Sequence, residues 1–341
     1  MSAAEAAPEN PTPGEPLNAA ELDALFPAFA AHDRVLLAVS GGPDSTALML
    51  LAARWRGLRP ARPDLLVATV DHGLRAESRR EAEGVGRLAS RLGLSHTVLA
   101  LSAQLPRTGL QEAARDARYE RLAAHARTVG AGAIATGHTA DDQAETVLFR
   151  LMRGSGLSGL AGIPAVRALD GLCLIRPLLG LRKGRLIEFC RQAGVEFARD
   201  PSNHDPRFAR ARLRQLLPLL AAEGLDAPRL ARLAERLARA DAALEVATDE
   251  AARRLLDGTG PLRIERRGLL ALPAEVGLRV LGRAVEMQAT GLVELAKLEA
   301  LHSWITALAP EASGARTLAG ALVRVDTRWV KIGRAPARRA K

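Results

Sequence analysis

Apolar runs that are typical of strands alternate with amphipathic stretches that are typical of helices over residues 34–200. The short apolar runs predict buried strands at 34–39, 65–70, 96–101, 132–136 and 172–175. The amphipathic stretches between them predict helices at 44–56, 77–92, 111–129 and 141–153. This alternation predicts right-handed βαβ units, and so an α/β fold whose parallel sheet carries helices on both faces.

The pattern changes near residue 221. Long helical patterns follow at 226–256, 274–289 and 292–308, and residues 317–332 alternate like a hairpin. We therefore predict an α/β domain over residues 19–220 and a smaller, mainly helical C-terminal domain over 221–341. Residues 1–18 are rich in Pro, Ala and Glu and lack a basic start before an apolar run, so they predict a disordered tail rather than a signal peptide.

The first predicted strand ends in a loop of small and polar residues, and a helix follows at once. The loop comprises Ser40, Gly41, Gly42, Pro43, Asp44 and Ser45. Glycines let a backbone approach an anion closely, and the N-terminus of a helix favours negative charge. Asp44 adds a carboxylate, a suitable ligand for the Mg²⁺ that accompanies a nucleotide. The loop is neither a P-loop nor a dinucleotide fingerprint, and an ordinary tight turn is the alternative interpretation.

Polar residues stand at the ends of other predicted strands, where ligands of parallel sheets bind. Asp71 follows the second strand and His138 follows the fourth. Asp142 and Glu145 are three residues apart at the start of a helix, so they share a face. Two carboxylates beside a nucleotide site can hold a metal ion or the ammonium group of a substrate. The alternative is that they only complement the helix dipole.

Basic residues form helical stripes in two places. Arg207, Arg210 and Arg214 recur at spacings of three and four, which suits contact with phosphate oxygens. Arg115 and Arg118 also share a face within the helix predicted at 111–129. A solvent-exposed helix face is the alternative in both places.

Composition changes this interpretation little. The net charge of +10 would favour a polyanionic partner, but only four of the 48 basic residues are Lys, which indicates a compositional bias of the genome. No stretch approaches the roughly 20 apolar residues of a membrane helix, so we expect no membrane partner. Cys173 and Cys190 form no Cys-x-x-Cys motif and predict neither a disulfide framework nor a tetrahedral metal site, which fits a cytoplasmic location.

Taken together, these motifs resemble the tRNA(Ile)-lysidine synthetase family of the PP-loop ATP pyrophosphatase superfamily. Besides the loop at 40–45, the matching segments are Asp71-His-Gly-Leu-Arg75, Arg115-x-x-Arg-Tyr119, Gly137-His-Thr-Ala-Asp-Asp-Gln-Ala-Glu145, Arg153-Gly-Ser-Gly156, Arg176-Pro-Leu178, Asp200-Pro-Ser-Asn203 and Arg210-Ala-Arg212. The resemblance spans about residues 34–218. The family usually has Arg-Asn-Arg at 210–212, so the amide is lost here while both arginines remain.

The resemblance implies a parallel-sheet, adenine-nucleotide α-hydrolase-like domain and a two-step reaction. ATP adenylates the 2-oxygen of the wobble cytidine in tRNA(Ile) with a CAU anticodon, and free L-lysine then displaces AMP. By resemblance, the loop 40–45 and Asp71 would bind ATP, with Mg²⁺ on Asp44, while Asp142 and Glu145 would bind L-lysine. The implied catalytic residues are Asp44, Arg118, His138 and Arg210, and the implied tRNA contacts are Arg207, Arg212 and Arg214.

Other functions compete with this one. A tRNA thiolase of the same superfamily would need paired cysteines, which Cys173 and Cys190 do not supply. An amidotransferase-type synthetase would need a glutamine-hydrolysing partner. A module that holds nucleotide or tRNA without turnover is the non-enzymatic alternative. The sequence leaves the oligomeric state open, with a homodimer as one candidate.

Overall fold

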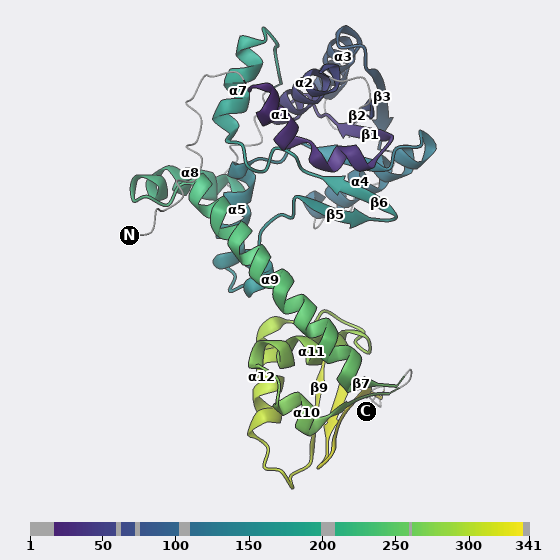
Figure 1. Cartoon of the computed structure of the whole chain (residues 1–341), viewed down its shortest axis with the longest axis vertical. Helices are drawn as coiled ribbons and strands as arrows, with labels where there is room; N and C mark the ends of the chain where they lie inside the picture. Colours follow the sequence, from purple (N-terminus) through teal and green to yellow (C-terminus); the bar gives the residue numbers. More distant parts are fainter. Residues whose placement is uncertain are drawn as a thin grey trace. The chain divides into compact units, whose positions relative to one another are not determined.

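The computed structural model describes residues 17–58, 63–71, 76–101, 110–198, 209–258 and 261–336, which form two compact units (Figure 1). The first unit runs to Met152 and resumes over Gly162–Ala234, and the second combines Arg153–Ala161 with the chain from Glu235 onward. Most of the tail predicted at 1–18 lies outside the described residues. Leu17, at its end, is buried against the core of the first unit.

Six described strands of the first unit form one sheet, in the order β3-β2-β1-β4-β6-β5. All neighbours are parallel except the edge pair β5 and β6. The strands are β1 (Arg34–Ala38), β2 (Asp64–Asp71), β3 (Ser95–Ala100), β4 (Ala133–Thr136), β5 (Val166–Leu169) and β6 (Leu172–Ile175). The five predicted strands are confirmed to within one residue at each end.

The edge strand β5 has no counterpart among the predicted strands. Its side chains are mostly exposed, so it has no apolar run to reveal it. Asp170 and Gly171 connect it to β6 with φ values of 47° and 80°. Two consecutive residues with positive φ form the tight hairpin turn for which Asp-Gly is a strong sequence signal. That dipeptide could therefore have revealed the hairpin.

Helices cover both faces of the sheet, as predicted, because successive side chains of each buried strand point to opposite sides. On β1, Val35 and Leu37 pack with α2, α3 and α7 on one face, and Leu36 packs under α4 on the other. The helices of this unit are α1 (Ala19–Leu25), the short 3-10 helix η1 (Pro27–Ala31), α2 (Pro43–Gly57), α3 (Ala76–Arg91), α4 (Leu110–Thr128), α5 (Ala140–Leu151), α7 (Lys183–Gln192) and α8 (Ala209–Ala222). The four helices predicted here are confirmed to within two residues at each end.

The second unit combines helices with an antiparallel sheet of five described strands, in the order β7-β8-β11-β10-β9. Its elements are α6 (Leu157–Leu160), the later part of α9 (Ala227–Leu255), β7 (Leu256–Asp257), β8 (Leu262–Glu265), α10 (Arg266–Leu270), α11 (Ala274–Glu286), α12 (Leu295–Ala307), β9 (Gly314–Leu318), β10 (Ala321–Val325) and β11 (Trp329–Arg334). Helical residues outnumber strand residues, which confirms the mainly helical character. The sequence had predicted only the terminal hairpin of the sheet.

One buried arginine organises the loops of the second unit. Arg266 is 3% exposed, and its guanidinium donates to five backbone carbonyl oxygens at 2.7 to 3.3 Å. Four of these oxygens belong to residues 308–312 and the fifth to Asp326. A single side chain therefore holds the segment after α12 against the turn before β11. No described helix is long and apolar enough to cross a bilayer.

Candidate active site

The predicted phosphate loop joins the central strand β1 to α2. Gly41 has a φ of 89°, a conformation that favours glycine. The Ser45 hydroxyl accepts from the backbone N–H of Ser40 at 3.2 Å and donates to the carbonyl of Gly42 at 3.1 Å. These bonds close the turn, and α2 begins with Pro43 in its first turn, where the missing N–H costs no hydrogen bond. The loop thus ends at a helix N-terminus, as an anion site requires.

Gly137 explains how the end of β4 reaches this loop. A Cβ atom at Gly137 would lie 2.8 Å from the carbonyl oxygen of Asp44 and 3.0 Å from the backbone nitrogen of Ser45. Only a glycine therefore allows the two backbones to meet. His138 follows directly, and its Nδ1 lies 2.8 Å from the hydroxyl of Thr136. This contact orients the imidazole beside the loop.

Asp44 is the charged residue of the loop, and an ion pair fixes its carboxylate. Its Oδ2 accepts from Nζ of Lys183 at 2.8 Å, and its side chain is 20% exposed. Its Oδ1 is buried and has no hydrogen-bond partner among the described residues. Burial raises the pKa of Asp44, Lys183 opposes that rise, and the nearby carboxylates of Asp142 and Asp141 add to it. The sequence singled out neither Lys183 nor Asp141.

Asp141 and Asp142, at the start of α5, both accept hydrogen bonds from backbone N–H groups. Thr139 caps the helix, and its backbone N–H donates to Oδ2 of Asp142 at 2.8 Å in a capping box. Oδ2 of Asp141 accepts from the backbone N–H of Lys183 at 2.7 Å, which ties α5 to the start of α7. The sequence offered only complementation of the helix dipole as the alternative for Asp142, and the structure adds this capping contact, which leaves the carboxylate near Asp44.

Glu145 lies one turn further along α5 and is 3% exposed. Its two carboxylate oxygens accept from Nε and Nη2 of Arg214 on α8, at 2.5 and 3.3 Å. Burial lowers the pKa of Arg214, but Glu145 outweighs this effect and the net shift is upward, with Asp142 and Asp44 contributing. The structure thus pairs two residues to which the sequence assigned different ligands, lysine for Glu145 and tRNA for Arg214.

Arg118 lies in a second basic cluster around Tyr119 on α4. The Cζ atoms of Arg115 and Arg167 lie 5.6 and 5.8 Å from the centroid of the Tyr119 ring. Arg176 is 3% exposed, and burial lowers its pKa, with Arg167 and Arg115 lowering it further against the opposing effect of Tyr119. Arg115 and Arg118 are both exposed. The cluster concentrates positive charge around one aromatic ring.

The remaining predicted residues are placed only in part. Oδ1 of Asp71, at the end of β2, accepts from the hydroxyl of Ser78 in α3 at 2.8 Å. Arg212 is exposed on α8. The backbone of Arg210 also lies in α8, but its side chain lies outside the described part of the structure, as does the whole of Arg207.

Cys190 lies directly beneath the loop. Its thiol donates to the carbonyl oxygen of Pro43 at a sulfur–oxygen distance of 3.7 Å. Burial raises the pKa of this thiol to about 11, with Asp44 contributing. A buried, protonated thiol is a poor nucleophile. Cys190 is therefore unsuited to carry a persulfide, which counts against thiolation.

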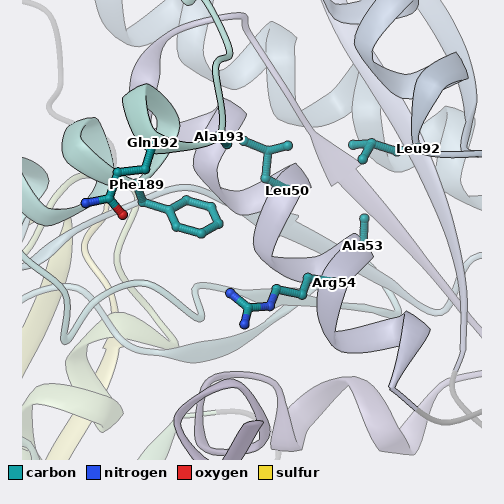
Figure 2. A pocket seen from close by; sticks show the side chains of 7 residues that line it. All are labelled: Leu50, Ala53, Arg54, Leu92, Phe189, Gln192 and Ala193. Atoms are coloured by element: carbon teal, nitrogen blue, oxygen red, sulfur yellow. The ribbon is translucent and has the colours of Figure 1, made fainter. Parts of the chain in front are cut away.

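A pocket of about 490 Å³ opens elsewhere, between α2 and α7 (Figure 2). It is lined by Leu50, Ala53, Arg54, Leu92, Phe189, Gln192 and Ala193. None of these residues belongs to the predicted site. The candidate site is therefore the loop and the ends of its neighbouring elements rather than this pocket.

Comparison with known proteins defines the class. The family model that describes the PP-loop domain matches residues 16–220. The first unit is thus a PP-loop domain. The U34-tRNA thiolase NcsA from Methanococcus maripaludis shares the fold, with a TM-score of 0.53 at 15% identity, over 63% of this chain and 77% of that one.

Relatives along nearly the whole chain define the family. The tRNA(Ile)-lysidine synthase of Bradyrhizobium sp. (strain BTAi1) is 50% identical over 347 residues, which cover 96% of this chain and 97% of the relative. That of Methylobacterium nodulans is 52% identical over 314 residues, which cover 90% and 91%. The chain therefore belongs to the tRNA(Ile)-lysidine synthase family, which confirms the predicted resemblance.

Proposed function

We propose that this protein ligates free L-lysine to the 2-position of the wobble cytidine in tRNA(Ile) with a CAU anticodon. The reaction consumes ATP and yields lysidine, AMP and pyrophosphate. Family membership supports the overall reaction, and one structural observation carries the assignment of the site. The phosphate loop, with the half-buried carboxylate of Asp44, lies near the start of α5, which presents Asp142 and Glu145. One region thus offers a place for a polyphosphate and carboxylates for a cationic substrate.

Asp44 fits a magnesium ion. Its Oδ1 is buried without a partner among the described residues, and Asp142 adds negative charge nearby. The described residues contain no group of three or more His, Cys, Asp or Glu side chains that could hold a metal ion. Phosphate oxygens and water would complete the shell, as is usual for Mg²⁺. The ion would neutralise the charge that develops on the pyrophosphate leaving group.

In the first step, the 2-oxygen of the cytidine attacks the α-phosphorus of ATP. The bond between the α-phosphorus and its bridging oxygen breaks, and pyrophosphate leaves with that electron pair. Backbone N–H groups at the start of α2 and the loop at 40–45 would bind the leaving phosphates. Arg118, Arg210 and His138 would stabilise the negative charge around the α-phosphate.

In the second step, the ε-amine of lysine attacks C2 of the adenylated cytidine. The C2–O bond breaks, AMP leaves with its electron pair, and the amine loses a proton to solvent water. Glu145 and Asp142 would hold the ammonium groups of the amino acid. Because Glu145 is bonded to Arg214, lysine would have to replace the guanidinium at this carboxylate.

The tRNA contacts and the cellular setting are further proposals. Arg207, Arg212 and Arg214 would bind tRNA phosphates, with Arg214 released from Glu145 to do so. Residues 19–220 would form the catalytic domain, and residues 221–341 would contact the tRNA. We place the enzyme in the cytoplasm, where its substrate tRNA is used, and a homodimer stays a prediction.

A labelling experiment tests the proposal. The protein is incubated with ATP, Mg²⁺, radiolabelled lysine and an isoleucine tRNA transcript with a CAU anticodon. We expect label in this tRNA and none in a transcript whose wobble cytidine is changed to uridine. Asp44→Asn should abolish labelling, whereas Asp33→Asn, which changes an exposed aspartate just before β1, should not. Cleavage of ATP to AMP and pyrophosphate without labelling would refute the proposed substrate, and thiolation would be tested next.

A further inference from the structure

Lys183 contributes a cation to the phosphate loop from a distant part of the chain. It is the first residue of α7, 139 positions after Asp44. Its ammonium group lies 2.8 Å from Oδ2 of Asp44, and its backbone N–H donates to Asp141. This ion pair is the one that Asp44 makes among the described residues. The contact fixes the backbone of Lys183 through α5 and leaves its four-carbon side chain as the moving part.

The charges around Asp44 explain why a cation lies there. Asp44 is half-buried, which raises its pKa, and the carboxylates of Asp141 and Asp142 raise that pKa further. A negative loop would repel a polyphosphate, so the loop needs a positive charge beside it. The side chain of Lys183 is 41% exposed, whereas that of Asp44 is 20% exposed. The ammonium group can therefore leave Asp44 towards the solvent side of the loop without losing its hydration.

We propose that Lys183 is the cation of a pyrophosphate subsite. Its ion pair with Asp44 neutralises that carboxylate. When a polyphosphate binds, the ammonium group moves from Asp44 to the β- and γ-phosphate oxygens, and Asp44 becomes available to a divalent cation. A lysine suits this exchange because its charge is compact and carried on a flexible stem. The inference rests on the proposed function, since it specifies how the same loop binds ATP.

Binding measurements test the assignment apart from catalysis. Calorimetry on the full-length protein would compare pyrophosphate with AMP, in the absence and presence of Mg²⁺. Lys183→Met should weaken pyrophosphate binding by about 10- to 100-fold, as expected for loss of a charge-assisted contact, and leave AMP binding unchanged. Lys183→Arg should retain most of the affinity. Arg182→Met removes an exposed charge one residue away and should behave as wild type.

A double-variant comparison separates binding from simple neutralisation of Asp44. In an Asp44→Asn background the carboxylate that Lys183 is bonded to is gone, so a Lys183 that only neutralises Asp44 would be silent there. We expect Lys183→Met to weaken Mg²⁺-free pyrophosphate binding in that background as well. An unchanged affinity there, or an equal loss of pyrophosphate and AMP binding, would overturn the inference. If Lys183→Met does not fold, Lys183→Gln serves in the same comparison.

Failure of the inference is distinguishable from failure of the proposed function. If the wild type labels tRNA with lysine while Lys183→Met binds pyrophosphate normally, the lysine assignment is wrong and the function stands. If the variant loses pyrophosphate binding while the wild type cleaves ATP and labels no tRNA, the subsite stands and the function is wrong.

Discussion

Breaking the Glu145–Arg214 pair from either side is expected to have unequal effects on stability. The side chain of Glu145 is 4% exposed and that of Arg214 is 35% exposed. Arg214→Met removes the guanidinium from a buried carboxylate, and removing one partner of a fully buried ion pair costs about 3–5 kcal/mol. Because water reaches Arg214, we expect about 2–3 kcal/mol here. Glu145→Gln leaves a guanidinium that water can solvate, so about 1 kcal/mol is expected.

The assay is thermal unfolding of the first unit. At about 2–4 °C per kcal/mol, Arg214→Met should lower its Tm by about 4–12 °C and Glu145→Gln by about 2–4 °C. Added lysine should then restore stability to Arg214→Met, because its ammonium group can take the place of the lost guanidinium at Glu145. At a lysine concentration of about 100 times its Kd, the gain would be about 2.7 kcal/mol.

Two controls decide whether the carboxylate recognises an ammonium group. Norleucine has the same chain as lysine without the terminal ammonium, so it should not stabilise Arg214→Met. Lysine should likewise fail to stabilise the double variant Glu145→Gln/Arg214→Met. Equal stabilisation by norleucine, or of the double variant by lysine, would refute the assignment of Glu145 to lysine binding. A smaller loss in Arg214→Met than in Glu145→Gln would refute the burial argument.

Three further perturbations test other parts of the structure. Gly137→Ala should raise the KM for ATP at least about tenfold because its Cβ would meet the loop backbone at 2.8 Å, whereas Gly184→Ala, with nothing within 4 Å, should not. Arg266→Met should expose the second unit to limited proteolysis by stranding carbonyl groups, unlike Arg263→Met at an exposed position. Ellman's reagent at pH 8 should leave Cys190 unmodified. The pKa of the Cys190 thiol is about 11 in the native state, against an ordinary value of 9.0. The free energy of unfolding should therefore fall as pH rises through this window, and Cys190→Ala should make the fall smaller.

The sequence predicts most of the first unit because its buried strands are short apolar runs with amphipathic helices between them. Such runs are unambiguous where a strand is covered on both faces, as β1 and β4 are. The sequence does not predict the edge strand β5, because its mostly exposed side chains form no apolar pattern. In the second unit, β8 alternates over only four residues, which is too short for periodicity to separate it from a loop.

The site is predictable where a motif is local in sequence. The loop at 40–45 depends on glycines and on neighbours along the chain, and it stands out. The close approach of Gly137 to Asp44 does not, because it joins two distant parts of the sequence. Lys183 does not, because a single lysine at the start of a helix has no motif. The role proposed for Lys183 depends on its ion pair with Asp44, which lies 139 positions earlier in the chain. The pairing of Glu145 with Arg214, across 69 positions, likewise needs the packing of α5 against α8.

Two ion pairs of the first unit share one arrangement of proposed binding roles. In each, a carboxylate proposed to bind a cation, Asp44 or Glu145, is bonded to a side chain proposed to bind phosphate, Lys183 or Arg214. Buried charges stay paired if both partners exchange together, and leaving one unpaired would be costly. Polyanionic ATP and tRNA would draw the two cations away and free the carboxylates for Mg²⁺ and lysine. Lysine affinity should then rise when ATP and tRNA are both bound, and by thermodynamic reciprocity bound lysine should tighten the joint binding of the two polyanions by the same factor.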